Sequence, residues 1–282
     1  MFRVKVENEV GDILNISEDR RYLITNIEGT SPPSSTIIRA GVAGQDGSRY
    51  NSSKVNERNL VMYIRFMSDV EKSRINLYKY LRTGGYVKFY FSNGTRDVFI
   101  EGHIEDMAVN NFSQTETMQV VILCPKPYFN AIDEVVDMMN NIKPLFRFPY
   151  ATTMIAQPLS VYEEAIEINV INSGDVDSGF ELILTARGEV VNPKIINGNT
   201  LEFLGVNFTM EAGDKIIFNT SRGSRSVTLL RDTEQINIFN YLMQDKTWLQ
   251  LKVGDNLFVA NTESGGALLD VTFKHRDLFE GV

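Results

Sequence analysis

The stretch YVKFYFSNGTRDVFI, residues 86–100, carries the clearest secondary-structure signal in the chain. Every second residue from Val87 to Phe91 is apolar, and the alternation resumes after a polar interruption. The interruption begins with Asn93-Gly94, which favours a type I′ turn because that turn requires positive φ at both central positions. The stretch therefore predicts a β-hairpin, and it points to a fold built mainly from antiparallel strands.

Further hairpins are predicted downstream. Lys194–Asn197 and Leu201–Phe203 flank a turn that begins at Gly198, and Asp214–Asn219 and Ser226–Leu230 flank Ser221-Arg222-Gly223. From Glu164 onward, short strands alternate with turn signals and need no helix between them, which is typical of a β-sandwich.

One helix is predicted between the strands. Ser68 precedes Glu71 by three residues, which is the spacing of a capping box. Apolar and long side chains then recur every three or four residues, and Gly84-Gly85 supplies a stop signal. The face expected to pack on the sheet comprises Val70, Arg74, Leu77, Tyr78 and Leu81.

The length of 282 residues and the 43% hydrophobic content allow two domains with cores of their own. Periodicity lapses between the two halves, where Pro144, Pro149 and Pro158 interrupt both the helical and the strand pattern. The predicted division is an N-terminal domain over 1–141, a linker over 142–160 and a C-terminal β-sandwich over 161–282.

Charge and composition exclude several function classes. The net charge of -8 disfavours binding to nucleic acid or to an anionic membrane, and no long apolar segment or signal peptide is visible. Cys124 is the only cysteine, and His103 and His275 lie far apart, so neither a disulfide nor a Cys/His zinc site is expected. No motif of a serine hydrolase, a nucleotide-binding loop or a zinc protease is present. We therefore expect no catalytic residues, no metal and no cofactor.

Several motifs, in order along the chain, resemble the distal tail protein family of siphophages. In the first half they are GVAGQDGSRY (41–50), VNERN (55–59) and ILCPKPYF (122–129). In the second half they are NSGDV (172–176), VNPKI (191–195), MEAGD (210–214) and LKVGDN (251–256). The resemblance covers nearly the whole chain.

The resemblance implies a mainly β protein with a little α structure. Its N-terminal domain is expected to be β-sandwich-like, with one amphipathic helix and an extended hairpin or loop. Its C-terminal domain is expected to be a galectin-like or carbohydrate-module-like β-sandwich. The implied function is structural: a homohexameric ring at the virion tail tip, assembled in the host cytoplasm, that joins the tail tube protein to the tail-associated lysin or fibre protein, or to receptor-binding proteins.

Candidate interface residues lie in the polar segment from Gly41 to Asn59, which is too long and too rich in Gly, Ser and Asn for a tight turn. We expect it to be an arm that orders against a neighbouring subunit. The candidates are Asp46, Arg49, Tyr50 and Arg58. The alternative function is recognition of host cell-wall polysaccharide by the C-terminal domain, with Trp248, predicted to lie in a strand, as the candidate sugar-stacking residue.

Overall fold

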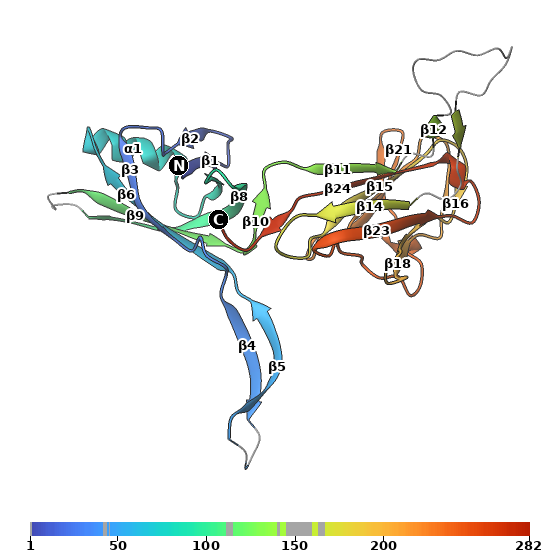
Figure 1. Cartoon of the computed structure of the whole chain (residues 1–282). Helices are drawn as coiled ribbons and strands as arrows, with labels where there is room; N and C mark the ends of the chain where they lie inside the picture. Colours follow the sequence, from blue (N-terminus) through green and yellow to red (C-terminus); the bar gives the residue numbers. More distant parts are fainter. Residues whose placement is uncertain are drawn as a thin grey trace. The chain divides into compact units, whose positions relative to one another are not determined.

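The computed structural model describes residues 2–41, 44, 46–110, 115–139, 142–144, 160–162 and 167–282 (Figure 1). The chain forms two compact units. Unit 1 comprises Met1–Ile132 and Leu278–Val282, and unit 2 comprises Asp133–Asp277. Unit 2 is therefore inserted into unit 1, and the chain passes between the units twice. The predicted mainly β fold with one α-helix is confirmed.

Unit 1 is built on one antiparallel sheet of nine strands, with the order β2-β1-β7-β8-β9-β6-β3 and two short strands, β10 and β25, added at β8. The bounds are β1 Arg3–Asn8, β2 Ile13–Asn15, β3 Tyr22–Glu28, β6 Arg58–Phe66, β7 Tyr86–Ser92, β8 Asp97–Asn110, β9 Thr117–Cys124, β10 Phe129–Ala131 and β25 Leu278–Phe279.

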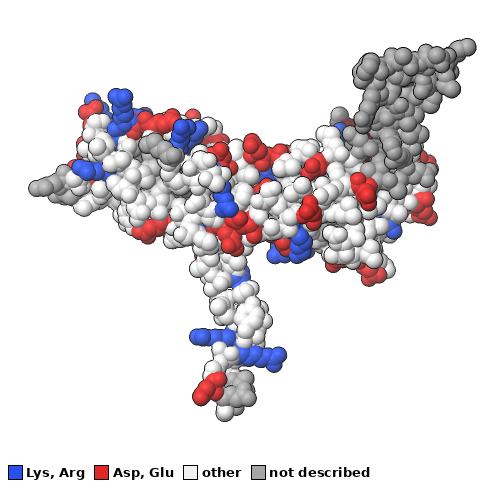
Figure 2. Space-filling view, viewed as in Figure 1, with Lys and Arg blue, Asp and Glu red and all other residues white. Residues whose placement is uncertain are grey.

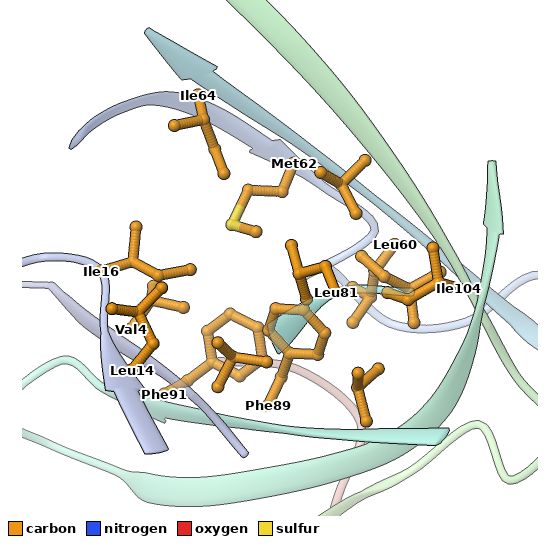
Figure 3. Packing of buried hydrophobic residues seen from close by; sticks show 14 of the residues in the cluster. Val4, Leu14, Ile16, Leu60, Met62, Ile64, Leu81, Phe89, Phe91 and Ile104 are labelled. Carbon is orange, nitrogen blue, oxygen red and sulfur yellow. The ribbon is translucent and has the colours of Figure 1, made fainter. Parts of the chain in front are cut away.

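The core of unit 1 follows from the alternation of its strands. Along β6, β7 and β9 every second side chain is buried, because successive side chains of a strand point to opposite faces of the sheet. Phe89 and Phe91 of β7 face Met62 and Ile64 of β6 across the core (Figure 3). The sheet thus encloses its own apolar centre in the manner of a sandwich.

The hairpin of β7 and β8 confirms the predicted strands but not the predicted turn. Ser92 is paired with Asp97, so the loop has four residues rather than two. Gly94 has a φ of +90°, whereas Asn93 is not among the residues with positive φ. The side-chain oxygen of Asn93 instead accepts hydrogen bonds from the backbone N–H groups of Thr95 and Arg96, at 2.8 Å each. Asn93 therefore shapes the loop through its amide, and the type I′ prediction is wrong.

The predicted helix is present as α1, Val70–Tyr80, with Leu77 and Leu81 buried in the core of unit 1. The predicted capping box does not form. The N-cap is Asp69, which has a left-handed backbone and no capping hydrogen bond from its side chain. The Ser68 carbonyl accepts the hydroxyl of Ser73, and Glu71 pairs with Arg74 one turn along the helix. Among the residues described, no helix has the length and apolar character to cross a membrane.

Strands β4, Ser35–Gly41, and β5, Ser48–Val55, form a separate two-stranded sheet. They pair with one another along their whole length and project away from the main sheet of unit 1 (Figure 1). We call residues 35–55 the arm. Of the segment predicted to be a polar loop, Gly41 to Asn59, residues Ser48–Val55 are the second strand of this hairpin, and Arg58 and Asn59 begin β6.

Unit 2 is a sandwich of two larger sheets with strand orders β11-β24-β15-β20-β21-β22 and β14-β23-β17-β18. The bounds in the first are β11 Val135–Met139, β24 Leu269–His275, β15 Phe180–Ala186, β20 Lys215–Asn219, β21 Ser226–Arg231 and β22 Glu234–Asn237. Those in the second are β14 Glu167–Asn172, β23 Gly254–Asn261, β17 Lys194–Asn197 and β18 Phe203–Gly205. The remaining elements are β12 Ile142–Pro144, β13 Ser160–Tyr162, β16 Val190–Val191, β19 Thr209–Met210 and the 3-10 helices η1 Phe239–Tyr241 and η2 Gly266–Leu268.

Three phenylalanines join the two sheets of unit 2. Phe180 on β15 and Phe273 on β24 lie in the first sheet, and Phe258 on β23 lies in the second. The ring centroids of Phe258 and Phe273 are 4.9 Å apart, and those of Phe180 and Phe258 are 5.7 Å apart. All three side chains are buried, so their contact is the aromatic centre of the sandwich. The hairpins predicted at β17–β18 and β20–β21 are both present.

The unit boundary lies earlier than the sequence suggests. The first crossing falls between Ile132 and Asp133, before the expected end of the N-terminal domain at 141. The predicted linker 142–160 does not separate the units, because β12 and β13 at its two ends pair with each other as part of unit 2. Residues 145–159 lie outside the described residues.

An ion pair between the buried Asp214 and the partly exposed Arg231 fixes a corner of unit 2. Asp214 is almost fully buried and accepts two hydrogen bonds from Arg231, at 2.8 and 2.5 Å, and one from the backbone N–H of Glu211 at 2.8 Å. The guanidinium of Arg231 holds the pKa of Asp214 below its usual value. A lowered pKa in the folded state means that the pair stabilises unit 2 above the ordinary carboxyl range and loses that contribution as pH falls through the folded-state pKa.

We expect Asp214→Asn to lower the free energy of unfolding of unit 2 by about 1–2 kcal/mol at pH 7, a value reduced for the partial exposure of Arg231. The difference from the unmodified protein should begin to shrink below about pH 4, where the aspartate of the unfolded chain takes up a proton, and should be lost once the pH falls below the lowered pKa of the folded state. Urea unfolding followed by Trp248 fluorescence measures the free energy of unfolding of both proteins at each pH. Glu234→Gln, on an exposed strand, is the control and should be neutral. An equal difference at pH 7 and pH 3 would contradict this reading of the ion pair.

Candidate assembly interface

The described residues of the arm expose apolar side chains on a hairpin whose two strands pair with each other. Ile37, Ile38 and Tyr50 are 59%, 50% and 61% exposed. Every described residue of β4 is exposed, as is every residue of β5 except Val55. A hairpin of two strands is marginally stable in water by itself, and it gains stability when an apolar face is covered. The arm therefore has the physical character of a segment that orders against a second surface.

The arm also differs in charge from the rest of the protein. Arg39, Arg49 and Lys54 stand against Asp46 as its only acidic residue, a net charge of +2 in a chain whose total is -8. Figure 2 shows basic groups along the arm and the acidic group at its tip. Arg39 and Tyr50 are paired across the two strands, as are Ala40 and Arg49. The predicted residues Asp46, Arg49 and Tyr50 thus lie together on the exposed half of the arm.

The arm is attached to the sheet through a short region that we call the arm root, residues 29–34 and 56–57. Asn56 ties its two strands together: its backbone N–H donates to the Ser34 carbonyl at 2.9 Å, and its side chain contacts the hydroxyls of Thr36 and Ser34 at 2.8 and 3.2 Å. Gly29 has a φ of +86°, and a Cβ there would lie 2.2 Å from the carbonyl oxygen of Asn59. The close approach of two backbone segments at Gly29 therefore fixes where the arm leaves the sheet.

Arg58 is not an interface residue, although the sequence analysis named it as one. Its side chain is buried beneath the arm root at the start of β6. The guanidinium donates to four main-chain carbonyls, those of Gly29, Ser31, Pro127 and Glu280, and its carbon atom Cζ lies 4.5 Å from the centroid of the Phe129 ring. Spacing along the chain placed Arg58 beside the polar arm, but its position on β6 turns it inward.

Burial lowers the pKa of Arg58 from its usual value. The donors compensate for the lost hydration because each of the four carbonyls accepts one of the N–H groups of the planar guanidinium. Two of these carbonyls, those of Gly29 and Ser31, belong to the arm root, and that of Glu280 belongs to residues Leu278–Val282, which we call the return segment. Arg58 thus joins the arm root, the segment after β9 and the return segment.

The comparisons with known proteins agree with this architecture. Residues 173–277 match the model of the siphovirus-type tail component, C-terminal domain. The matched residues lie within unit 2, which is therefore similar to that domain. The resemblance to siphophage distal tail proteins is thereby confirmed. A comparison with curated proteins gives no match.

Solved structures share the fold over nearly the full length. The SPP1 Dit protein, described as a paradigm of the hub adsorption apparatus in phages that infect Gram-positive bacteria, has 14% identity and a TM-score of 0.68 over 97% of this chain and 98% of its own. Chains of the phage P2 baseplate in its activated conformation, with Ca and with Sr, have 9% identity and TM-scores of 0.50 and 0.53, each over 98% of both chains. At these identities the likeness is one of fold.

In unit 2, Trp248 does not lie in a strand, contrary to the expectation from its alternating neighbours. It is half-buried between two partners. Its ring stacks on Phe239 with centroids 5.9 Å apart, and Cζ of Arg225 lies 5.3 Å from its centroid. The exposed aromatic groups nearby are Phe239 itself and Tyr241, both in η1. Sequence reasoning missed these two residues because it sought a lone tryptophan rather than a cluster.

Cys124 lies in unit 1, and His275 lies in unit 2. The thiol of Cys124 is buried, and burial raises its pKa to about 12, so it is not a nucleophile at neutral pH. His275 is buried in unit 2. Its Nε2 atom lies 3.7 Å from a carboxylate oxygen of Asp137, and its Nδ1 atom lies 3.6 Å from one of Asp277. Within the described ranges, no three His, Cys, Asp or Glu side chains are grouped so as to hold a metal ion.

The role of Arg58 predicts a strong effect of a substitution that keeps its charge. We expect Arg58→Lys to lower the free energy of opening of unit 1 by about 3 kcal/mol, because one ammonium cannot reach all four carbonyls and each unpaired buried group costs about 1–3 kcal/mol. Hydrogen exchange of the β6 and β10 amides, followed by mass spectrometry, measures this free energy.

Arg49→Lys on the exposed arm is the matched control, with an expected change within about 0.5 kcal/mol. Equal protection of β6 and β10 in Arg58→Lys and in the unmodified protein would show that the four hydrogen bonds contribute little.

Proposed function

We propose that this chain is a structural, non-enzymatic phage tail-tip protein that assembles as a homohexameric ring. The ring joins the tail tube protein to the tail-associated lysin or fibre protein, or to receptor-binding proteins. The proposal places the protein at the virion tail tip, after assembly in the host cytoplasm. It is supported by the match of residues 173–277 to the siphovirus-type tail component model and by a fold shared over almost the whole chain with SPP1 Dit and with chains of the P2 baseplate. The number six comes from the resemblance to distal tail proteins alone.

The arm is the observation that carries the ring. A cyclic assembly uses heterologous contacts, in which each subunit offers two different complementary surfaces. An exposed hairpin with isoleucines at 37 and 38 is one such surface, because covering these side chains removes apolar area from water. Its second surface is the body of the neighbouring subunit.

Electrostatics favours the same contact. Since the arm carries +2 and the whole chain -8, the remainder of the chain is strongly acidic. A basic arm is therefore attracted to the body of another copy, and like-charged bodies are kept apart until the arms engage. The arm supplies both an apolar contact and a charge of the opposite sign.

We expect the double substitution Ile37→Ser and Ile38→Ser to raise the dissociation constant of the ring at least about tenfold, because burial of one isoleucine side chain is worth about 1.5–3 kcal/mol. Multi-angle light scattering across a concentration series measures the change. Ile171→Ser with Val253→Ser, two residues of unit 2 that are as exposed as those on the arm, is the matched control. Identical assembly of the arm variant and the control would remove the arm from the interface.

Carbohydrate recognition by unit 2 is the second candidate, and one observation favours it. Phe239 stacks on Trp248 beside Arg225, and Tyr241, which packs against Phe208, is exposed in the same 3-10 helix as Phe239. Aromatic faces next to hydrogen-bond donors are suited to sugar rings. Because the Trp248 ring already contacts both Phe239 and Arg225, the exposed rings of Phe239 and Tyr241 would make the contact.

The two functions are separated by binding to purified bacterial cell walls. If unit 2 recognises a wall sugar, Phe239→Ala with Tyr241→Ala abolishes co-sedimentation, while the arm variant binds normally. If the chain is a structural hub alone, neither protein nor variant sediments with the walls, and ring formation is unaffected by the aromatic substitutions.

A further inference from the structure

The return segment leaves unit 2 and adds a strand to unit 1 beside the arm root. Within it, β25 pairs with β10 through Phe129 opposite Phe279 and Asn130 opposite Leu278. Cζ of Arg96 lies 4.5 Å from the centroid of the Phe279 ring. Residues far apart in sequence therefore complete one edge of the unit that carries the arm.

Beyond β25 the return segment contacts the arm root directly. The backbone N–H of Val282 donates to the Thr30 carbonyl at 3.1 Å. The carbonyl of Gly281 accepts a hydrogen bond from Arg96 at 2.7 Å, and that of Glu280 accepts one from Arg58 at 2.6 Å. A Cβ on Gly281 would lie 3.0 Å from the Thr30 carbonyl oxygen and 3.5 Å from Pro32. The root of the arm is thus packed against the return segment on one side and joined to it through Arg58 below.

The other end of the return segment is anchored in unit 2. Only Arg276 and Asp277 separate it from the end of β24 at His275. The side chain of Asp277 accepts a hydrogen bond from the backbone N–H of Ser173 at 3.2 Å, and Arg276 lies 3.6 Å from Glu134. A displacement of the end of β24 therefore reaches residues 280–282 through a short stretch of chain.

We infer that the return segment is the positioning element of the arm: residues 280–282 hold the arm root in place, and their anchorage after β24 links the position of the arm to the folding of unit 2. The inference rests on the proposed role of the arm only for its consequence in assembly. The positioning itself is a property of the single chain. It gives residues 280–282, which lie outside the arm, a part in deciding whether assembly occurs.

The test measures the position of the arm in the full chain, at a concentration too low for assembly. Spin labels at Ser52→Cys on the arm and Lys5→Cys on β1 report one distance by pulsed electron resonance. The native Cys124 is buried and stays unlabelled. Val282→Pro removes the N–H that bonds to Thr30, whereas Val282→Ala removes side-chain packing and keeps that N–H.

We expect Val282→Pro to widen the distance distribution about twofold and to speed exchange of the Asn56 amide about tenfold, with Val282→Ala close to the unmodified protein. If the amides of β6 to β9 also exchange faster in Val282→Pro, that variant is unfolded and Gly281→Ala takes its place. The added methyl group must displace Thr30, so we expect the mean distance between the two spin labels to shift. An unchanged distribution in a folded Val282→Pro, or in Gly281→Ala where the first variant unfolds, overturns the inference.

The linkage to unit 2 is tested with Asp277→Ala against Asp277→Asn, since the asparagine keeps an oxygen that accepts from Ser173. We expect the distribution of spin-label distances to broaden in Asp277→Ala alone. Equal distributions in the two variants overturn the linkage to unit 2. These outcomes are independent of the ring. If the arm loosens as expected but the unmodified protein forms no ring, the proposed function fails and the positioning role stands.

Discussion

The guanidinium of Arg58 satisfies four main-chain carbonyls from three separate stretches of unit 1 at once. Main-chain carbonyls that leave water must find donors, and here they converge where no strand ladder can provide them. Arginine is the one side chain with enough N–H groups in a fixed plane to serve all four, and the Phe129 ring covers its face. The exit of the arm, the end of β9 and the return segment all take their places from this site.

The two units achieve stability by different means. Unit 2 is a sandwich whose aromatic centre comprises Phe180, Phe258 and Phe273. It also holds an ion pair between the buried Asp214 and the partly exposed Arg231. Unit 1 is a sheet that folds over its own core. It is completed by β25, a strand that follows unit 2 in the sequence. A discontinuous unit of this kind depends on contacts with high sequence separation, which are reached late in folding.

The elements predicted correctly from the sequence are those whose apolar residues recur with a regular period. Alternation identified β7, β8, β17, β20 and β21, and three- and four-residue spacing identified α1 with its buried Leu77 and Leu81. The features that the sequence did not predict depend on tertiary contact. The left-handed backbone at Asp69 displaced the capping box, and the amide of Asn93 shaped a longer loop than Asn-Gly suggests. Arg58 looked like a surface charge beside a polar segment, because nothing in the sequence shows that four carbonyls meet there. Ile37 and Ile38 were overlooked since the strand that holds them is exposed throughout.

The insertion of unit 2 has a consequence in time. Ribosomal synthesis proceeds at ~5–20 residues per second, so residues 278–282 emerge roughly 7–30 s after Ile132. Throughout that interval the sheet that bears the arm lacks β25, and the carbonyl of Glu280 has not yet reached Arg58. A nascent chain therefore carries an arm whose root is incomplete. Chain order alone thus delays the maturation of the arm until unit 2 has been made.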